Sequence, residues 1–149
     1  MDNPANINDL LSRLFTTQQL GVLSTDLEGQ PYSNLVAFAA TEDLKSLVFV
    51  TNRNTSKYAN IISNPKVAMM IDSRTNKQSD FNSAVAVTIL GTAEEIAGNE
   101  RDHLLERYIA KHPHLADFVS RPYQALMRVT TSDFIIASFD RVQVLHIGE

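Results

Sequence analysis

The sequence predicts a mainly β protein: an antiparallel barrel or sandwich of six or seven strands with peripheral α-helices. Short runs rich in β-branched and aromatic residues recur along the chain, and tight turns join most of them. The length of 149 residues is that of one ordinary domain with a single core, so we expect one domain over residues 1–149.

The chain opens with a predicted helix and a predicted hairpin. Residues 5–16 place apolar side chains at three- and four-residue spacing, which is typical of an amphipathic helix. Residues 20–40 predict two strands around the turn DLEGQP. In that turn Gly29 is expected at positive φ, and Pro31 opens the second strand.

A third strand is predicted over residues 47–52, followed at once by a helix. Asn54, Thr55 or Ser56 is expected to cap this helix, and the pair Asn64–Pro65 stops it. Its expected apolar stripe consists of Tyr58, Ile61 and Ile62.

The second half alternates between strands and polar or helical segments. The patterns predict a strand over 67–72, a loop over 73–82, and a long strand over 84–96 with a bulge or bend at Gly91. Helical periodicity returns over 99–120, with a break at Pro113 and a short second helix after it, and two or three strands complete the chain.

Composition excludes several classes of function. The net charge is −4 and no basic stripe is present, so no nucleic-acid partner is expected. The absence of cysteine excludes disulfides, thiolate zinc sites and cysteine nucleophiles. The start, MDNPANINDLL, lacks the apolar region of a secretory signal, and no apolar run is long enough to span a bilayer. We therefore expect a cytoplasmic protein with no membrane partner.

The acidic and histidine pairs of the sequence give no catalytic or metal site. We expect His112 and His114, which flank Pro113, to lie at a solvent-facing helix break without a metal. Glu94 and Glu95 are consecutive on a predicted strand, so they point to opposite faces and form no carboxylate dyad. No GxGxxG, P-loop, GxSxG or HExxH pattern occurs either.

The stretch TNRNTSK, residues 51–57, is the strongest candidate site. A strand that ends at Thr51, followed by a helix that begins near Thr55, directs the free N–H groups of the first helical turn toward an anion. Ser56 adds a hydroxyl donor, and Arg53 and Lys57 add positive charge suited to phosphate. The alternative is that these residues are ordinary helix caps and exposed cations.

Two further segments extend the candidate site. The loop after the strand over 67–72 is rich in donors, among them Arg74 and Asn76, and resembles the second side of a groove for a phosphorylated ligand. In the strand over 31–40, Ser33 and Asn34 interrupt an apolar run. Residues 33–36 offer the backbone groups, small side chains and amide that a flat heteroaromatic ring requires along its polar rim.

The order of these elements resembles the FMN-binding split-barrel family related to pyridoxamine 5'-phosphate oxidase. The similarity runs from about Leu20 to Ile96, and its most specific part is the strand that ends in Thr-Asn, the Ser-Lys pair that opens a helix, and the following Asn-Pro. The resemblance implies a mainly β, six- to seven-stranded antiparallel Greek-key split β-barrel with peripheral α-helices, which forms a homodimer with FMN at the subunit interface.

The resemblance also implies residue roles. Thr51, Ser56 and Lys57 would hold the FMN phosphate, with Arg53 and Thr55 as helpers. The residues that would run beside the isoalloxazine ring are Ser33, Asn34, Leu35 and Val36. Arg74 and Asn76 would lie near the ribityl chain or phosphate, or come from the second subunit.

Departures from the pattern argue against vitamin B6 oxidation. The strand containing SNLVAFA has none of the basic residues found there in the oxidases, and the chain has no tryptophan. We therefore expect an FMN-dependent oxidoreductase that acts on an unidentified small molecule, with no catalytic residue identifiable. Tyr32 and Tyr123 are candidates for lining a substrate pocket. One alternative is a non-catalytic module that carries electrons, stores FMN or binds haem, and His112, His114 or His146 would bind the haem. Another alternative is a dimeric barrel without a cofactor.

Overall fold

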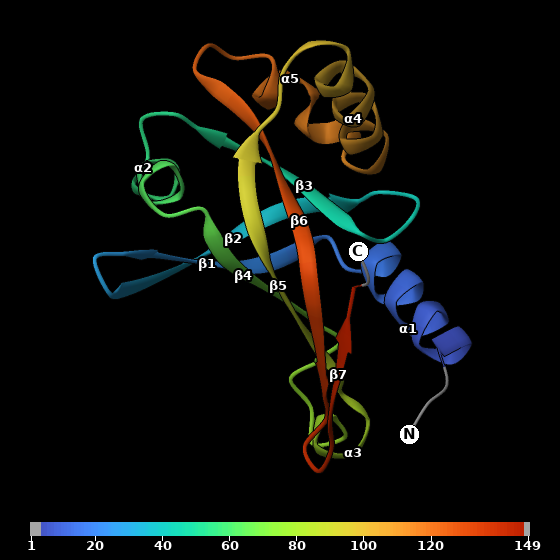
Figure 1. Ribbon diagram of the computed structural model, residues 1–149. Helices are drawn as coiled ribbons and strands as arrows, with labels where there is room; N and C mark the ends of the chain where they lie inside the picture. Colours follow the sequence, from blue (N-terminus) through green and yellow to red (C-terminus); the bar gives the residue numbers. More distant parts are fainter. Residues whose placement is uncertain (1–3, 148–149) are drawn as a thin grey trace.

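The computed structural model describes residues 4–147, apart from the side chains of the first two of them. Its seven strands form one antiparallel sheet in the order β3-β2-β1-β4-β5-β6-β7, and β3 also pairs with β6, which closes a six-stranded barrel (Figure 1). The predicted split-barrel class is confirmed. The strands are β1 (Leu20–Leu27), β2 (Gln30–Ala40), β3 (Ser46–Asn52), β4 (Lys66–Asp72), β5 (Ala86–Glu95), β6 (Gln124–Ala137) and β7 (Val142–His146).

Five α-helices lie around this barrel. They are α1 (Pro4–Thr17), α2 (Ser56–Ser63), α3 (Asp80–Ser83), α4 (Gly98–Lys111) and α5 (Ala116–Val119), with a 3-10 turn at Pro113–Leu115 between the last two. Helix α5 is the short helix expected after the break at Pro113, whereas α3 was not predicted, because a four-residue turn is too short to show a period in the sequence.

Strand β6 is the element that closes the barrel. It pairs with β5 from Met127 to Ala137, while its other edge pairs with β3 as far as Thr130 and with β7 from Asp133 onward. Between these two partners the register against β5 shifts by one residue, at Ser132, which is the bulge predicted near Gly91. A Cβ on Gly91 would lie 2.2 Å from the carbonyl oxygen of Thr130, so only glycine permits this close approach of the two strands.

The β1–β2 hairpin projects away from the barrel and creates a fork in the sheet. Its turn residues Glu28 and Gly29 have φ values of 53° and 86°, the two positive values that a type I′ turn requires. Pairing between β2 and β3 ends at Phe38 and Phe49, and beyond this point the two strands separate. Figure 1 shows α2 lying between the hairpin and the end of β3, so the fork and the start of α2 share one end of the barrel.

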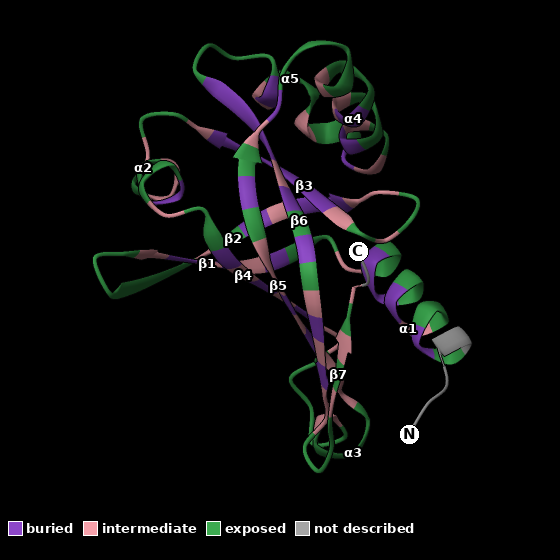
Figure 2. Ribbon diagram, viewed as in Figure 1, coloured by how far each residue is buried: buried purple, intermediate pink, exposed green. Residues whose placement is uncertain are grey.

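Two apolar clusters hold the helices to the sheet. Helix α1 buries Ile7, Leu11, Leu14 and Phe15 against the main core, and Figure 2 shows buried positions alternating with exposed ones along this helix. The Phe15 ring meets the Phe38 ring edge-on, with 6.2 Å between the ring centroids. Helix α4 buries Leu104 and Tyr108 in a second cluster with residues of β3 and β6. These helices therefore cover faces of the barrel that would otherwise be exposed.

Three local predictions were wrong. Ile62 of α2 is 61% exposed, and the buried positions of that helix are Asn60 and Ile61, since the Asn60 amide donates to the Thr25 hydroxyl at 3.0 Å. The segment over 73–82 is not loop throughout, because α3 begins at Asp80. His112 is buried rather than solvent-facing, and its Nε2 lies 2.7 Å from the Phe38 carbonyl oxygen.

Candidate functional site

The start of helix α2 is fixed by hydrogen bonds among its own hydroxyls. Thr55 is the N-cap, and its Oγ1 donates to the Asn52 carbonyl at 2.7 Å and accepts from the Tyr58 N–H at 3.3 Å. Because the Thr55 proton is committed, the buried Thr51 hydroxyl, 3.2 Å away, must donate to Thr55. Thr55, one of the three residues expected to cap the helix, is therefore its cap, and the Thr51 hydroxyl is hydrogen-bonded to that cap.

Ser56 and Lys57 present the donors that remain unused. Within residues 4–147, no hydrogen bond or ion pair engages the side chain or the backbone N–H of either residue. The two N–H groups lie in the first turn of α2, where the helix dipole favours an anion. Burial lowers the pKa of Lys57, and no neighbouring carboxylate offsets that cost. A half-buried cation without a counter-ion therefore lies next to free N–H groups, an arrangement whose charge and donors suit an anionic group.

Arg53 is paired within the chain. Its guanidinium binds the Glu95 carboxylate through two nitrogens, Nε at 3.3 Å and Nη2 at 2.5 Å, and the Tyr58 hydroxyl donates to the same carboxylate at 2.7 Å. These bonds, the Arg53 contact foremost, lower the pKa of Glu95. Arg53 is thus held beside α2, but it has fewer free donors for a phosphate than an unpaired arginine would have. Glu95 is a further residue of the site, and nothing in the sequence had indicated it.

Tyr123 and Gln124 border the same end of β3. The Arg53 N–H donates to the Tyr123 carbonyl at 2.8 Å, and Gln124 pairs with Asn52 in the β3–β6 ladder. Tyr123 is 63% exposed at a φ of 69°, an uncommon conformation for a bulky residue. The buried Gln124 Oε1 accepts no hydrogen bond from any group in residues 4–147. Gln124 is therefore an available acceptor that sequence reasoning missed, because a polar residue at a strand start carries no distinguishing signal.

Residues 33–36 form the other branch of the fork. The Ser33 hydroxyl lies 3.0 Å from that of Ser24, Leu35 is 63% exposed, and Val36 is buried. The Asn34 Oδ1 is buried and has no hydrogen-bond partner in the part of the chain that the structure describes. Extending the β2–β3 register beyond its last pair places Val36 level with Thr51, so the predicted ring-binding strand and the predicted phosphate-binding segment face each other across the fork.

Arg74 and Asn76 do not join this group within one chain. They follow the C-terminal end of β4, whereas α2 precedes its N-terminal end. Figure 1 shows the α3 segment at the opposite end of the barrel from α2. There both residues line a cavity of about 740 Å³, and Arg74 Nε lies 3.0 Å from Asp72 Oδ2. A ligand that spans both donor-rich segments therefore needs a second copy of the chain.

The histidines form no metal centre in the part of the chain that the structure describes. His112 is committed to Phe38, and His146 is paired with Asp133. Between residues 4 and 147, no group of three or more potential ligands from His, Asp and Glu is close enough to hold a metal ion. In the same range, no helix combines the length and the apolar character required to cross a bilayer.

Comparisons with solved structures find the same fold in proteins of distant sequence. A heme binding protein from Mycobacterium smegmatis has a TM-score of 0.80 at 14% identity, with 91% of this chain and 56% of that chain covered. HutZ, the heme storage protein from Vibrio cholerae, has a TM-score of 0.72 at 12% identity, with 98% and 95% covered. A FAD-binding protein from Mesorhizobium loti has a TM-score of 0.71 at 16% identity, with 87% and 90% covered.

Coverage limits what these structures say about whole proteins. This chain spans 56% of the M. smegmatis chain and 58% of an Agrobacterium tumefaciens protein of unknown function. No curated protein matches the sequence. A family model described as Pyridoxamine 5'-phosphate oxidase matches residues 7–139, which include all six strands of the closed barrel, β1 to β6. The chain therefore belongs to the pyridoxamine 5'-phosphate oxidase family.

Proposed function

We propose that this protein binds FMN in the fork between β2 and β3 and acts as a small oxidoreductase on an unidentified compound. The observation that carries the proposal is the unpaired, half-buried Lys57 ammonium beside the free N–H groups of α2. In a barrel of this family, those donors fit the terminal phosphate of FMN.

The phosphate would be held by groups that have no other partner. Lys57 supplies the charge, and Ser56 supplies a hydroxyl and a backbone N–H. Thr51 and Thr55 act indirectly, since they fix the cap that orients the first turn. Arg53 is a secondary contributor whose guanidinium must share its bonds with Glu95.

The rest of the cofactor would lie against residues that have unused acceptors. The backbone of residues 33–36 and the free Asn34 Oδ1 suit the polar rim of the isoalloxazine ring, whose N–H group requires an acceptor. Gln124 Oε1 suits a ribityl hydroxyl. FMN when bound supplies the redox chemistry, and the protein contributes binding, orientation and a restricted path for water.

A homodimer is part of the proposal. The hairpin side of the barrel exposes large apolar side chains, Leu27 at 41%, Tyr32 at 47% and Leu35 at 63%, which a second subunit would cover. Such a dimer would also allow Arg74 and Asn76 of one subunit to approach the cofactor of the other, as expected from the sequence.

A non-catalytic module that binds FMN or haem is the second candidate. One structural neighbour is a heme binding protein and another is a heme storage protein, and the exposed His114 would be the accessible imidazole in this chain. Since His112 and His146 are already bonded within the chain, FMN is the better match to the groups that remain free.

The test is a comparison of FMN with riboflavin, which lacks only the phosphate. We expect apo-protein to bind FMN at least about tenfold more tightly than riboflavin, because a charge-assisted hydrogen bond contributes about 1.5–3 kcal/mol. Equal affinities would contradict the phosphate site, and a protein that binds haem but neither flavin would support the second candidate. Reduction of the bound flavin by NAD(P)H and rapid reoxidation by a substrate would distinguish an enzyme from a store.

A further inference from the structure

A cavity of about 510 Å³ lies between α1, α4 and the turn that joins β2 to β3. Figure 1 shows this turn between the two helices, on the side of the barrel away from α2. The apolar part of its lining includes Phe15, Ala39, Ala40 and Leu44. A cavity of this volume, with an apolar wall and a few polar groups, is typical of sites for small organic molecules.

Two cations of α4 line this cavity one helical turn apart. Arg107 and Lys111 are separated by four positions, so they lie on the same side of the helix. Neither side chain forms an ion pair within residues 4–147. Like charges at this spacing destabilise a helix, and an anion bound beside both of them would offset that repulsion.

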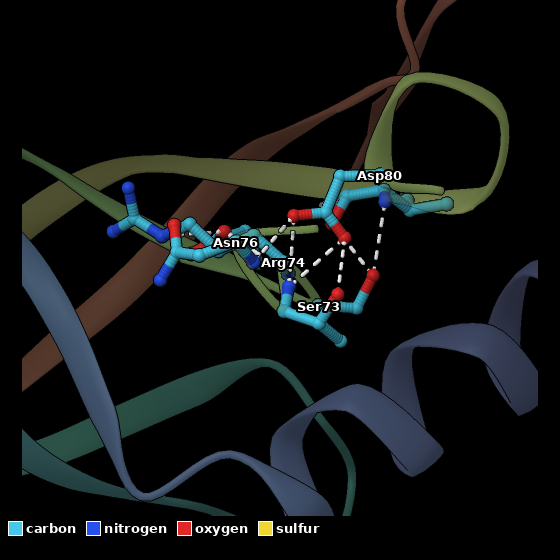
Figure 3. A network of polar contacts seen from close by, with 7 residues as sticks. Ser73, Arg74, Asn76 and Asp80 are labelled. Atoms are coloured by element: carbon cyan, nitrogen blue, oxygen red, sulfur yellow. Dashed lines mark hydrogen bonds and ion pairs between the residues drawn. The ribbon is translucent and has the colours of Figure 1, made fainter. Parts of the chain in front are cut away.

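Arg107 offers a pair of free donors in a fixed orientation. Its Nε donates to the Ala40 carbonyl at 2.6 Å, and its two terminal nitrogens have no partner in the described part of the chain. Arg74, by contrast, pairs with Asp72 and borders the hydrogen-bonded loop shown in Figure 3. A guanidinium that is anchored through Nε can still bind both oxygens of an anion with its two terminal nitrogens.

Lys111 holds a positive charge at the cavity wall without a counter-ion. Its half-buried Nζ donates to the carbonyls of Phe15 and Gln18 at 2.8 and 2.7 Å, and lies 3.8 Å from the centroid of the Phe38 ring. Burial lowers the pKa of Lys111 to about 8, and no carboxylate offsets that cost. A bound anion would therefore stabilise the charged form of this lysine.

The other walls supply two hydroxyls and a carboxylate. Ser12 and Thr16 lie four positions apart on α1, and neither hydroxyl is hydrogen-bonded within residues 4–147. Glu42 of the β2–β3 turn contributes the carboxylate. Together with the two cations of α4, it leaves the described lining with one net positive charge. A ligand with a single negative charge would neutralise this excess, whereas a dianion would reverse it.

The β2–β3 turn is a fixed wall of the cavity. The Asp43 carboxylate accepts from the Thr41 hydroxyl at 2.7 Å and from the Lys45 N–H at 2.9 Å. Leu44, between these bonded positions, has a φ of 65°. A turn with this internal bonding needs little further ordering when a ligand binds, so the entropic cost of binding is correspondingly small.

We propose that this cavity binds a small carboxylic acid that has an apolar body and a single negative charge. The carboxylate binds the terminal nitrogens of Arg107 beside the Lys111 ammonium, and the apolar body lies against Phe15 and Leu44. The site stands independently of the flavin proposal, since it uses none of the groups at α2 and lies at the opposite end of β2 from residues 33–36.

The test is a nuclear magnetic resonance titration of the isotopically labelled full chain with three probes of equal carbon number. Hexanoate carries one charge, hexanamide is its neutral counterpart, and adipate is the dianion. We expect hexanoate to shift the backbone amide signals of residues 39–44 and 107–111 saturably. Hexanamide should bind at least about tenfold more weakly, the loss expected for one charge-assisted contact, and adipate should also bind more weakly than hexanoate.

Three variants assign the charges of the cavity. Arg107→Gln should weaken hexanoate binding about tenfold and leave hexanamide binding unchanged. Arg101→Gln, which removes an arginine of the same helix outside the cavity lining, should affect neither probe. Glu42→Gln raises the net charge of the lining, so it should increase the affinity for adipate more than that for hexanoate. Unchanged far-ultraviolet circular dichroism confirms that each variant is folded.

Four results would overturn this inference. Equal binding of hexanoate and hexanamide, or hexanoate binding that Arg107→Gln leaves unaltered, would remove the charge-assisted contact. Tighter binding of adipate than of hexanoate to the unaltered chain would contradict a ligand with one charge. Hexanoate shifts confined to residues 33–36 and 51–57 would place the carboxylate in the proposed flavin site. A loss of FMN affinity in Arg107→Gln would show that the cavity is not a separate site.

Discussion

Lys57 is the residue whose removal tests the phosphate site most directly. Lys57→Met keeps the aliphatic stem and removes the charge. One charge-assisted contact contributes about 1.5–3 kcal/mol, so we expect the Kd for FMN to rise about 10- to 100-fold. Flavin fluorescence titration of apo-protein measures this change. Riboflavin affinity should be unchanged, and Lys66→Met, an exposed lysine at the start of β4, serves as the matched control.

The same substitution should have the opposite effect on the unliganded protein. Burial lowers the pKa of Lys57, which means that folding disfavours its charged form. Lys57→Met removes that cost, so the melting temperature of the apo-protein should rise or stay constant while FMN affinity falls. Unchanged FMN affinity, or an equal loss of riboflavin affinity, would refute the assignment of Lys57 to the phosphate.

Three further predictions concern the barrel and its ion pairs. Gly91→Ala should lower the free energy of unfolding by about 3 kcal/mol in urea denaturation, because the new methyl group meets the Thr130 carbonyl and β5 and β6 must separate. Glu95→Gln should lower it by at most about 1 kcal/mol at pH 7, since the pair with Arg53 is partly exposed. Because the pKa of Glu95 is lowered in the folded protein, the pair with Arg53 stabilises the protein above pH about 4.5, and this stabilisation is lost as the pH falls through the folded pKa. The free energy of unfolding of Glu95→Gln should therefore depend less on pH in this acid range. Burial lowers the pKa of His112 in the folded protein, so the free energy of unfolding should fall as the pH drops below about 6.5. His112→Gln should reduce the slope of the free energy of unfolding against pH in this range by up to about 1.4 kcal/mol per pH unit.

Local chemistry explains why several elements could be predicted from the sequence. The cap at Thr55 and the stop at Asn64–Pro65 lie within a few residues of the helix that they bound. The positive φ of Gly29 and the bulge at Gly91 likewise follow from a property of glycine at a turn and at a close approach of two strands. Such features depend on neighbours in sequence or on backbone conformation, and a single sequence displays them.

Contacts between distant segments could not be predicted in this way. The sequence predicts Arg53 as a free phosphate ligand, but in the fold Glu95, 42 residues away, binds its guanidinium. The sequence predicts an exposed His112, but in the fold its ring contacts the carbonyl of Phe38 in β2, which lies 74 positions earlier in the chain. Asn60 is buried and Ile62 exposed because Thr25 of β1 offers the amide a partner. In each case tertiary pairing decided the environment, and residue type alone pointed the other way.

The double pairing of β6 governs the order in which this protein can fold during synthesis. Strand β3 must wait for Gln124 through Thr130 before its outer edge is paired, although it was made some seventy positions earlier. Until then the ribosome-bound chain presents the open edge of β3 and the apolar face over which β6 will lie. Non-local closure of this kind slows folding and prolongs exposure of an unpaired edge. The β6 segment is therefore where a rare-codon pause or a destabilising substitution would most increase aggregation of the nascent chain.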